Sequence, residues 1–383
     1  MPAVEQDLTQ GSVTRKLVRY ALPLVASSLL QAIYSITDII IAGHYIGDVG
    51  ISAINNASII MNMLTQLAIG LTVGGNVLVG QYFGSGDHEN RRKAAGNMLT
   101  VGLIAGLLFA AGILLLGRPL LILLQSPTLE EATAYLSICG VGLLFIFVYN
   151  SLSAILRGVG NSRIPLYCII ASVSLNVVLD ILFVAGFHMG VAGAALATVI
   201  SQAISAAWVL KFLTGRKAIL RLRLRNLALG AGRVKSIVAL GLSGFFMNLT
   251  NSLVQVVCNA TLQAYGGDLY VGVMTIINSL REVFMMPVHG LSNGAQPVTG
   301  YNYGAGLYSR VRQSIRFSVA VTVGYAAVFW AAAMLFPGLL IRVFNSEPEV
   351  VAAGIPALRI YFCLFIPMSL QSAGQAVFVA LGR

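Results

Sequence analysis

The sequence predicts an all-α polytopic membrane protein built from two parallel-repeat helical lobes. Three observations support this fold class. Only 10% of the 383 residues are charged and 57% are hydrophobic, whereas about a quarter of the residues in a soluble domain are charged. Apolar runs of 20 or more residues recur along the chain, and each is long enough to cross a bilayer of about 30 Å. The second half of the chain also repeats the glycine pattern of the first half.

Ten apolar segments are expected to form the membrane helices. They cover residues 17–41, 49–80, 94–117, 128–156, 165–187, 190–213, 236–262, 269–299, 314–341 and 350–381. Several are longer than a bilayer requires, so we expect them to tilt or bend. Pro23 lies within the first segment, where a missing N–H favours a kink in the helix. A membrane β-barrel would show shorter segments with alternating polarity.

The basic residues are concentrated in alternate loops. Of the 24 Lys and Arg residues, 20 lie in, or within three residues of, the stretch before the first segment, the loops after the second, fourth, sixth and eighth segments, or the last residue. Such loops face the cytoplasm by the positive-inside rule. We therefore expect an integral, multi-pass protein of the plasma (inner) membrane with both termini cytoplasmic. The net charge of +11 then reflects topology, with contacts to membrane lipids and none to nucleic acid.

An internal repeat divides the chain into two lobes. When the second half is aligned on the first at one constant offset, Gly70 matches Gly290, Gly74 matches Gly294, and Gly84 matches Gly304. Six segments separate the copies, so both cross the membrane in the same sense. We expect a six-helix N-terminal lobe (1–213), a basic cytoplasmic linker (214–235) and the first four helices of a C-terminal lobe (236–383). Residues 161–213, which include the fifth and sixth segments, have no counterpart in the second copy. We therefore expect that the complete fold has 6 + 6 helices and that this chain, with 6 + 4, lacks the last two.

Several motifs resemble one family of transporters. They are "GLSNGAQPVTGYNYGAG" (290–306), its counterpart "GLTVGGNVLVGQYFGSGDHENRRKAAG" (70–96), "ILRGVGNSRIPL" (155–166) and Pro23. As a set they resemble the MATE family of multidrug and toxic compound extrusion transporters, in its DinF-like branch. The resemblance extends over the whole chain.

The carboxylates outside the loops and chain ends are few: Asp38, Asp180 and Glu282. A carboxylate in the middle of a bilayer is costly and is by default a functional candidate. Asn176 and Asp180 are four residues apart and share one helical face. With Asp38 and the Thr198 hydroxyl they would form an oxygen-rich pocket. Two neighbouring carboxylates should hold a proton or a hard cation such as Na⁺, and nothing there favours a transition metal.

The family resemblance implies the same site. It implies that Asp38, Asn176, Asp180 and Thr198 form the H⁺ or Na⁺ coupling site. It implies Tyr34, Tyr135 and Asn150 as polar neighbours. The alternative interpretation is a structural polar cluster that joins three helices.

A second set of residues is a candidate for a substrate cavity. Glu282 could face such a cavity or pair with Arg359, and it need not pair with Arg281, which points about 100° away around the helix. Gln296 could line the path between the lobes. Met286 could offer a soft apolar surface, although core packing is the alternative role.

The function predicted from these features and the resemblance is secondary active multidrug efflux. Amphipathic or cationic compounds would be exported in exchange for H⁺ or Na⁺ by alternating access. We expect a monomer with no organic cofactor, and no enzyme, because no HExxH or Walker sequence occurs. A lipid-linked precursor flippase is one alternative, although it would need a cluster of Arg or Lys within the helices. A transport-inactive truncated remnant is the other alternative.

Overall fold

The computed structural model describes residues 8–124, 126–215, 218, 220–222 and 224–382. Within these ranges it describes all side chains except those of residues 32, 35, 36, 39, 48, 224, 225, 243–245, 247–249 and 252. The described residues form α1 (Val13–Tyr45), α2 (Asp48–Gly84), α3 (His88–Leu123), α4 (Leu129–Gly158), α5 (Arg163–Asp180) with a π-helix (Ile181–Gly186), α6 (Gly190–Thr214), a 3₁₀ turn (Leu224–Leu227), α7 (Ala231–Gly304), α8 (Tyr308–Leu335), α9 (Pro337–Arg342), α10 (Pro348–Phe362) and α11 (Phe365–Ala380).

All ten predicted segments fall on helices, but the number of helices differs from ten. Among the described residues, seven helices are long and apolar enough to cross a membrane, or eight if α10 and α11, bent by 44°, form one span. One difference arises because α7 joins two predicted segments at Gly267, whose φ of 65° and ψ of −164° are not helical. The other difference concerns α1. This helix has 33 residues, but four of its side chains are not described, so it is not among the seven helices.

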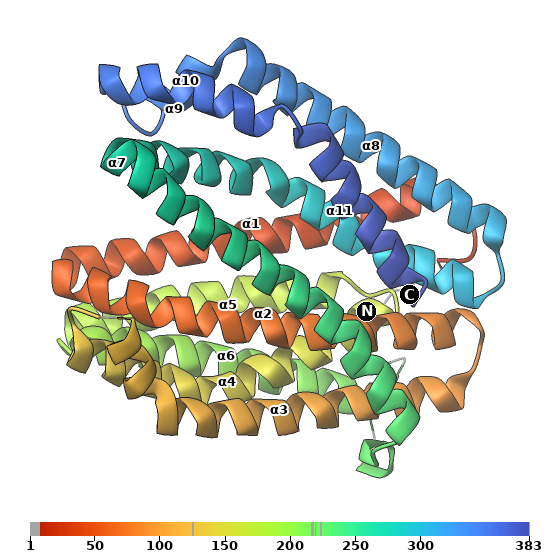
Figure 1. Ribbon diagram of the computed structural model, residues 1–383. Coiled ribbons are helices and arrows are strands. Elements are labelled where there is room, and N and C mark those ends of the chain that lie inside the picture. Colours follow the sequence, from red (N-terminus) through yellow and green to blue (C-terminus); the bar gives the residue numbers. More distant parts are fainter. Residues whose placement is uncertain (1–7, 125, 216–217, 219, 223, 383) are drawn as a thin grey trace.

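The helices form two groups that meet at one end (Figure 1). The first group contains α1–α6. The second group contains α8–α11 and the part of α7 after Gly267, while the earlier part of α7 crosses over and packs on α2. In Figure 1 the groups diverge toward the left and meet toward the right, where the N and C labels lie.

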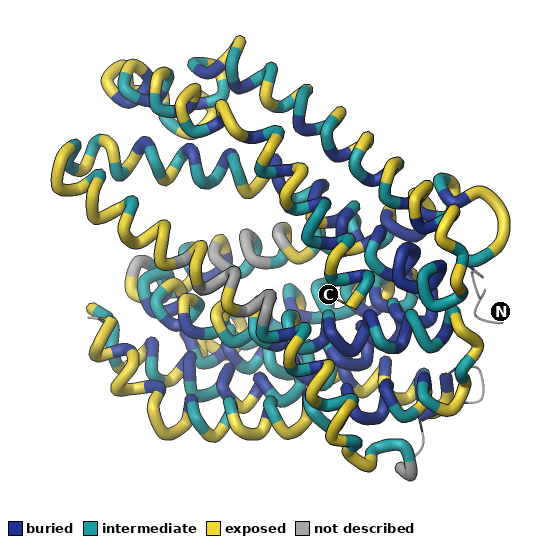
Figure 2. The backbone as a smooth tube through the Cα atoms, turned by 45° about the vertical axis from the view of Figure 1, so that its right-hand side comes forward, coloured by how far each residue is buried: buried dark blue, intermediate teal, exposed yellow. Residues whose placement is uncertain are grey.

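We call the end where the groups meet the basic end. The loops at residues 85–87 and 305–307 lie there, and each is followed by a cluster of basic residues (Arg91, Arg92 and Lys93; Arg310, Arg312 and Arg316). Buried residues are concentrated where the two groups meet near this end, whereas exposed residues dominate the outer faces (Figure 2). The two groups therefore pack against each other mainly near the basic end.

Reciprocal glycine contacts join the two groups at the basic end. A Cβ added to Gly84 would overlap the backbone carbonyl of Tyr301, and a Cβ added to Gly304 would overlap that of Gln81. The alignment of the repeat makes Gly84 equivalent to Gly304 and Gln81 equivalent to Tyr301. The contact thus resembles a two-fold interface, in which each side presents the same surface to the other. The sequence repeat predicts this symmetry.

A second reciprocal contact lies further along the helices. A Cβ added to Gly74 on α2 would overlap the backbone of Ile237 in the first part of α7. A Cβ added to Gly294, the equivalent of Gly74, would overlap Ala21 on α1. Each contact joins the first helix of one copy of the sequence repeat to the second helix of the other copy, so the glycines permit backbone approach at related places.

The connection between the groups differs in extent from the predicted linker at 214–235. α6 ends at Thr214, but α7 begins at Ala231, so its first turn lies within the predicted linker. Residues 216, 217, 219 and 223 of the linker lie outside the described residues. Gly230, at the N-cap of α7, has an extended backbone, which ends the irregular stretch.

The chain before α1 crosses onto the second group. Arg310 on α8 donates from Nη1 to the carbonyl oxygen of Gly11 (2.8 Å) and from Nη2 to that of Leu8 (3.2 Å). Asn302, near the end of α7, also donates to the Leu8 carbonyl (3.2 Å) and accepts from Arg310 Nε (2.9 Å). The Leu8 side chain is fully buried. We call residues 8–12 the N-terminal segment.

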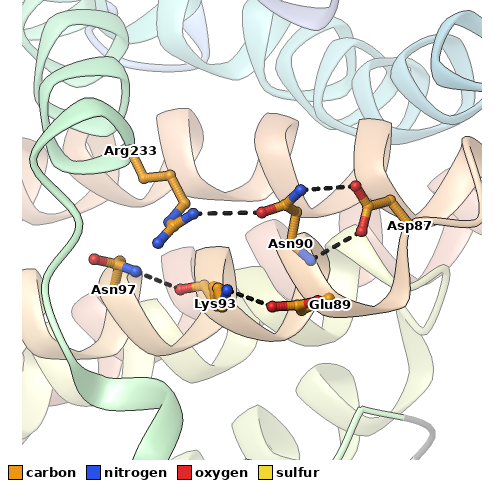
Figure 3. Close-up of polar contacts among 6 residues, drawn as sticks. All are labelled: Asp87, Glu89, Asn90, Lys93, Asn97 and Arg233. Atoms are coloured by element: carbon orange, nitrogen blue, oxygen red, sulfur yellow. Dashed lines mark hydrogen bonds and ion pairs between the residues drawn. The ribbon is translucent and has the colours of Figure 1, made fainter.

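The chain before α7 crosses in the opposite direction, onto the first group (Figure 3). The backbone N–H of Gly230 donates to Asn97 Oδ1 on α3 (2.6 Å), and Arg233 Nη1 donates to Asn90 Oδ1 (3.4 Å). We call residues 228–230 the linker segment. The alignment of the repeat makes this segment equivalent to residues 8–10 and makes Asn90 equivalent to Arg310. Each group therefore holds the segment that leads into the other.

Candidate ion site in the first group of helices

Asn176 connects the two carboxylates that the sequence places within helices. Its amide nitrogen, turned toward these groups, donates to Asp38 Oδ1 (3.0 Å) and to Asp180 Oδ2 (2.9 Å). Its amide oxygen then accepts from the backbone N–H of Thr198 (3.3 Å). One side chain on α5 thus contacts both α1 and α6. The four predicted coupling residues meet at one place.

Two hydroxyl groups complete the inner part of this site. The Tyr34 hydroxyl on α1 lies 3.1 Å from the Thr198 hydroxyl on α6. Tyr34 is also within hydrogen-bonding reach of Asp38, which lies one turn further along α1. Asp38 in turn is within hydrogen-bonding reach of Asp180. The site is therefore a compact set of carboxylate, amide and hydroxyl groups from three helices.

Asp180 lies at a change in helix type. It is the last residue of α5, and the π-helix Ile181–Gly186 follows directly. Its side chain is 2% exposed, and its Oδ1 atom has no hydrogen-bond partner among the described residues. π-helical turns are rare and are frequent at functional sites. The apolar stretch "ILFVAG" has no feature that distinguishes a π-helix from an α-helix, so sequence reasoning did not predict it.

The three predicted polar neighbours occupy different places. Tyr34 belongs to the site itself. Tyr135, 8% exposed, lies beside Cys139 on α4, and its surroundings include Tyr34 and Asp38. The Asn150 amide donates to the carbonyl of Ile146 on its own helix (2.9 Å). The structure therefore brings Tyr135 next to the site and shows the Asn150 amide engaged elsewhere.

Pro23 lies within α1, which is continuous on both sides of it. The proline lacks an N–H, so it leaves the carbonyl one turn earlier without its helical donor. The Ser27 hydroxyl donates to the Pro23 carbonyl (2.8 Å), and the Ser28 hydroxyl donates to the Leu24 carbonyl (3.1 Å). Polar side chains thus add to the local hydrogen bonding. This is a region where α1 is able to bend.

The residues considered for a substrate cavity all lie on the second part of α7. Glu282 is 65% exposed and forms an ion pair with Arg281, rather than with Arg359. The pairing occurs although the two residues point about 100° apart around the helix, because the flexible Arg side chain can reach around the helix surface. Met286 and Gln296 are both half-buried.

The chemistry of the site suits a proton or a hard cation. Carboxylate, amide and hydroxyl oxygens are ligands for ions such as Na⁺, whereas thiolate and imidazole groups favour transition metals. Among the described residues, no group of three or more His, Cys, Asp or Glu side chains could hold a metal ion. Two carboxylates so close together repel each other when both are charged, and a proton or a cation relieves that repulsion.

The chain matches a known protein family over most of its length. The sequence model of the family described as MatE matches residues 23–182 and 244–383. These two ranges include every residue of the site except Thr198. They also include the reciprocal glycines of both groups.

Individual relatives and a solved structure are similar over nearly the whole chain. The "Probable multidrug resistance protein YpnP" of Bacillus subtilis (strain 168) is 29% identical over 367 residues, which cover 94% of this chain and 81% of that protein. The "Multidrug export protein MepA" of Staphylococcus haemolyticus (strain JCSC1435) is 23% identical over 355 residues, covering 92% and 78%. A MOP superfamily transporter from Pyrococcus furiosus has a similar fold, with a TM-score of 0.90, 23% identity and coverage of 100% and 86%.

Proposed function

The chain belongs to the MatE family, and we propose that it is a secondary active antiporter that exports amphipathic or cationic compounds in exchange for H⁺ or Na⁺. Its relatives are named as multidrug resistance and export proteins. The chain shares with them the class of multidrug efflux transporters of the membrane. The choice of ion, the antiport mechanism and the substrates are the parts that we propose.

The bridge from Asn176 to Asp38 and Asp180 is the observation that supports coupling at this site. With both carboxylates charged, the pair is strained by repulsion that one amide partly offsets. Binding of H⁺ or Na⁺ removes this repulsion and draws α1 toward α5 and α6. Ion binding would thereby change the position of α1, which also contacts the second group through Ala21.

A movement of α1 would affect the contact between the two groups. By linkage, an ion that favours one arrangement weakens the binding of a substrate that favours the other, and the substrate weakens ion binding by the same factor. We propose that substrate binds between the groups and that the ion and the substrate compete through these two arrangements. The ion site and the substrate would then never need to touch.

The arrangement in Figure 1 corresponds to one of these two states. The groups meet at the basic end, which the positive-inside rule assigns to the cytoplasm. We therefore propose that this state is closed toward the cytoplasm. Opening that side would separate Gly84 from Tyr301 and Gly304 from Gln81. It would also stretch or release the N-terminal and linker segments, because each is held by the opposite group.

The test is transport in proteoliposomes that contain the full chain under an imposed H⁺ or Na⁺ gradient. We expect a cationic dye to move against its gradient with one of the two ions. Asp38→Asn and Asp180→Asn should abolish this coupled movement. Glu131→Gln, at an exposed carboxylate in the first turn of α4, is the matched control and should transport normally.

Two results would contradict the proposal. One is the absence of coupled movement of any tested cationic or amphipathic compound under either gradient by folded protein. The other is unchanged coupling in both Asp38→Asn and Asp180→Asn, which would leave the polar cluster with a structural role only.

A further inference from the structure

A small cavity lies in the second group of helices, separate from the candidate ion site. The space open to the centre of a water molecule there is about 10 Å³. The walls come from α7, α8 and α11. Ala373 and Ala376 of α11 form one side. This space matches the room that one water molecule needs in a protein interior, about 10–15 Å³ by the same measure.

Three hydroxyl groups that line the cavity lack partners. Ser292 on α7 is 8% exposed, and Ser318 and Thr322 on α8 are 5% and 1% exposed. None of their hydroxyl oxygens has a hydrogen-bond partner among the described residues. A fourth lining hydroxyl, that of Thr299, already pairs with Ser314 at 2.9 Å. Buried polar groups nearly always have a partner, so three orphan hydroxyls at one cavity need an explanation.

The internal repeat explains why the cavity exists in this group. Thr322 is equivalent to Gly102 in the alignment of the repeat. After Ser126 the distance between matching residues increases by two, so that Ala154 matches Ala376 and Ser151 matches Ala373. In the first group, the Ser151 side chain occupies the space beside Gly102, where an added Cβ would overlap its hydroxyl. In the second group the hydroxyl comes from Thr322 instead. The facing residue is alanine, which leaves room.

We propose that this cavity binds one ordered water molecule, held by the hydroxyls of Ser292, Ser318 and Thr322. A buried water typically makes about three hydrogen bonds, which equals the number of orphan hydroxyls. A monovalent cation fits the size but not the chemistry, because no described lining residue is charged. An uncompensated ion in an apolar interior is very unfavourable.

The bound water links two helices of the second group. It joins α7 to α8 through hydrogen bonds and lies beneath α11. The remaining lining hydroxyl, that of Thr299, does not replace it, because Thr299 is engaged with Ser314. The water therefore braces α7 against α8, so that the second group moves as one body. This inference concerns the second group alone and does not depend on the proposed ion coupling.

The direct test is an experimental structure of the full chain at a resolution that shows ordered water. We expect one peak within hydrogen-bonding distance, about 2.7–3.2 Å, of the three hydroxyl oxygens. A parallel data set with Tl⁺ in place of Na⁺ should show no anomalous signal at this peak. An empty cavity with the hydroxyls turned onto carbonyls of the preceding turn would overturn the proposal, and so would a Tl⁺ signal.

Two variants test the same proposal from the protein side. Ala373→Ser restores the residue that the first group has at this place, and its hydroxyl should expel the water and fill the cavity. Thr322→Val keeps the shape but removes one anchor, and should lower both the water occupancy and the thermal unfolding midpoint. Thr275→Val is the control, because the Thr275 hydroxyl is exposed and donates to its own helix. A water peak that persists in Ala373→Ser, or equal midpoints for Thr322→Val and Thr275→Val, would overturn it.

Discussion

Gly84 and Gly304 occupy equivalent positions in the two groups of helices, and each lies against the backbone of the other group. The partner of Gly84 is Tyr301, and the partner of Gly304 is Gln81, so the two contacts are related by the sequence repeat. Backbone meets backbone at both places, with no side chain between them. A side chain at either glycine would force the helices apart at the end where the groups meet.

Gly84→Ala and Gly304→Ala should each weaken the closed arrangement of the basic end. An added methyl group in a tightly packed contact costs about 1–3 kcal/mol, which shifts a two-state equilibrium by about fivefold to a hundredfold or more. We expect faster labelling of a cysteine introduced at the contact by a membrane-impermeant thiol reagent.

Gly324→Ala is the control for both glycine variants. A Cβ at Gly324, on α8, would meet no atom within 4 Å, and alanine should slightly favour the helix. Equal labelling of all three variants would show that the close contacts at Gly84 and Gly304 do not control the closed arrangement.

The sequence alone predicted the parts of this molecule that depend on composition and periodicity. The ten apolar segments correspond to helices, and the repeat predicted that Gly84 and Gly304 are equivalent, whereas their contacts with the other group are seen only in the structure. Asp38, Asn176, Asp180 and Thr198 could be selected because polar residues are rare within the segments and because they match a family pattern. The structure brings these four residues together.

Features that depend on side-chain reach or on local backbone geometry were not predictable in this way. The π-helix after Asp180 has an ordinary apolar sequence. Arg281 pairs with Glu282 because a long side chain reaches around the helix. The crossing of residues 8–12 onto Arg310 depends on where a loop lies in space, which hydropathy does not encode.

Asn176→Ala should weaken ion binding more than most single substitutions in the site. It removes two hydrogen bonds to carboxylates, and a hydrogen bond to a charged group contributes about 1.5–3 kcal/mol. We expect an affinity for the coupling ion at least about tenfold lower, measured as the ion concentration that gives half-maximal transport. Asn56→Ala is the matched control, because the Asn56 amide donates only to Ser52 on its own helix (2.9 Å). An unchanged ion affinity in Asn176→Ala would contradict the central role of the amide bridge.

Arg310→Ala should release the N-terminal segment. The variant loses the hydrogen bonds from Arg310 to Gly11 and Leu8, and each such bond contributes about 1 kcal/mol. We expect hydrogen–deuterium exchange of the backbone amides at residues 8–12 to be about tenfold faster or more. Arg312→Ala removes the same charge from an exposed position on α8 and serves as the control. Equal exchange in the two variants would mean that the segment is held by other contacts.

Asp87 provides a pH-dependent cap at the start of α3, next to the residues that hold the linker segment (Figure 3). The backbone N–H of Asn90 donates to Asp87 Oδ1 (3.0 Å), and the Asn90 side chain donates to Oδ2 (2.7 Å). These hydrogen bonds favour the charged carboxylate and lower the pKa of Asp87 below its ordinary value of 3.8. Because the pKa is lower in the folded state, the cap stabilises the helix above about pH 4 and loses this effect as the pH falls through the folded value.

The pH dependence of the first turn of α3 tests this cap. Hydrogen–deuterium exchange of the Asn90 amide, corrected for its intrinsic rate, should lose protection as the pH is lowered below about 4. In Asp87→Asn the amide oxygen can still cap the helix but does not titrate, so the protection should persist across the same range. Since Asn90 also accepts from Arg233, loss of the cap should loosen the linker segment as well. Identical pH profiles in the native chain and Asp87→Asn would assign the change to another group.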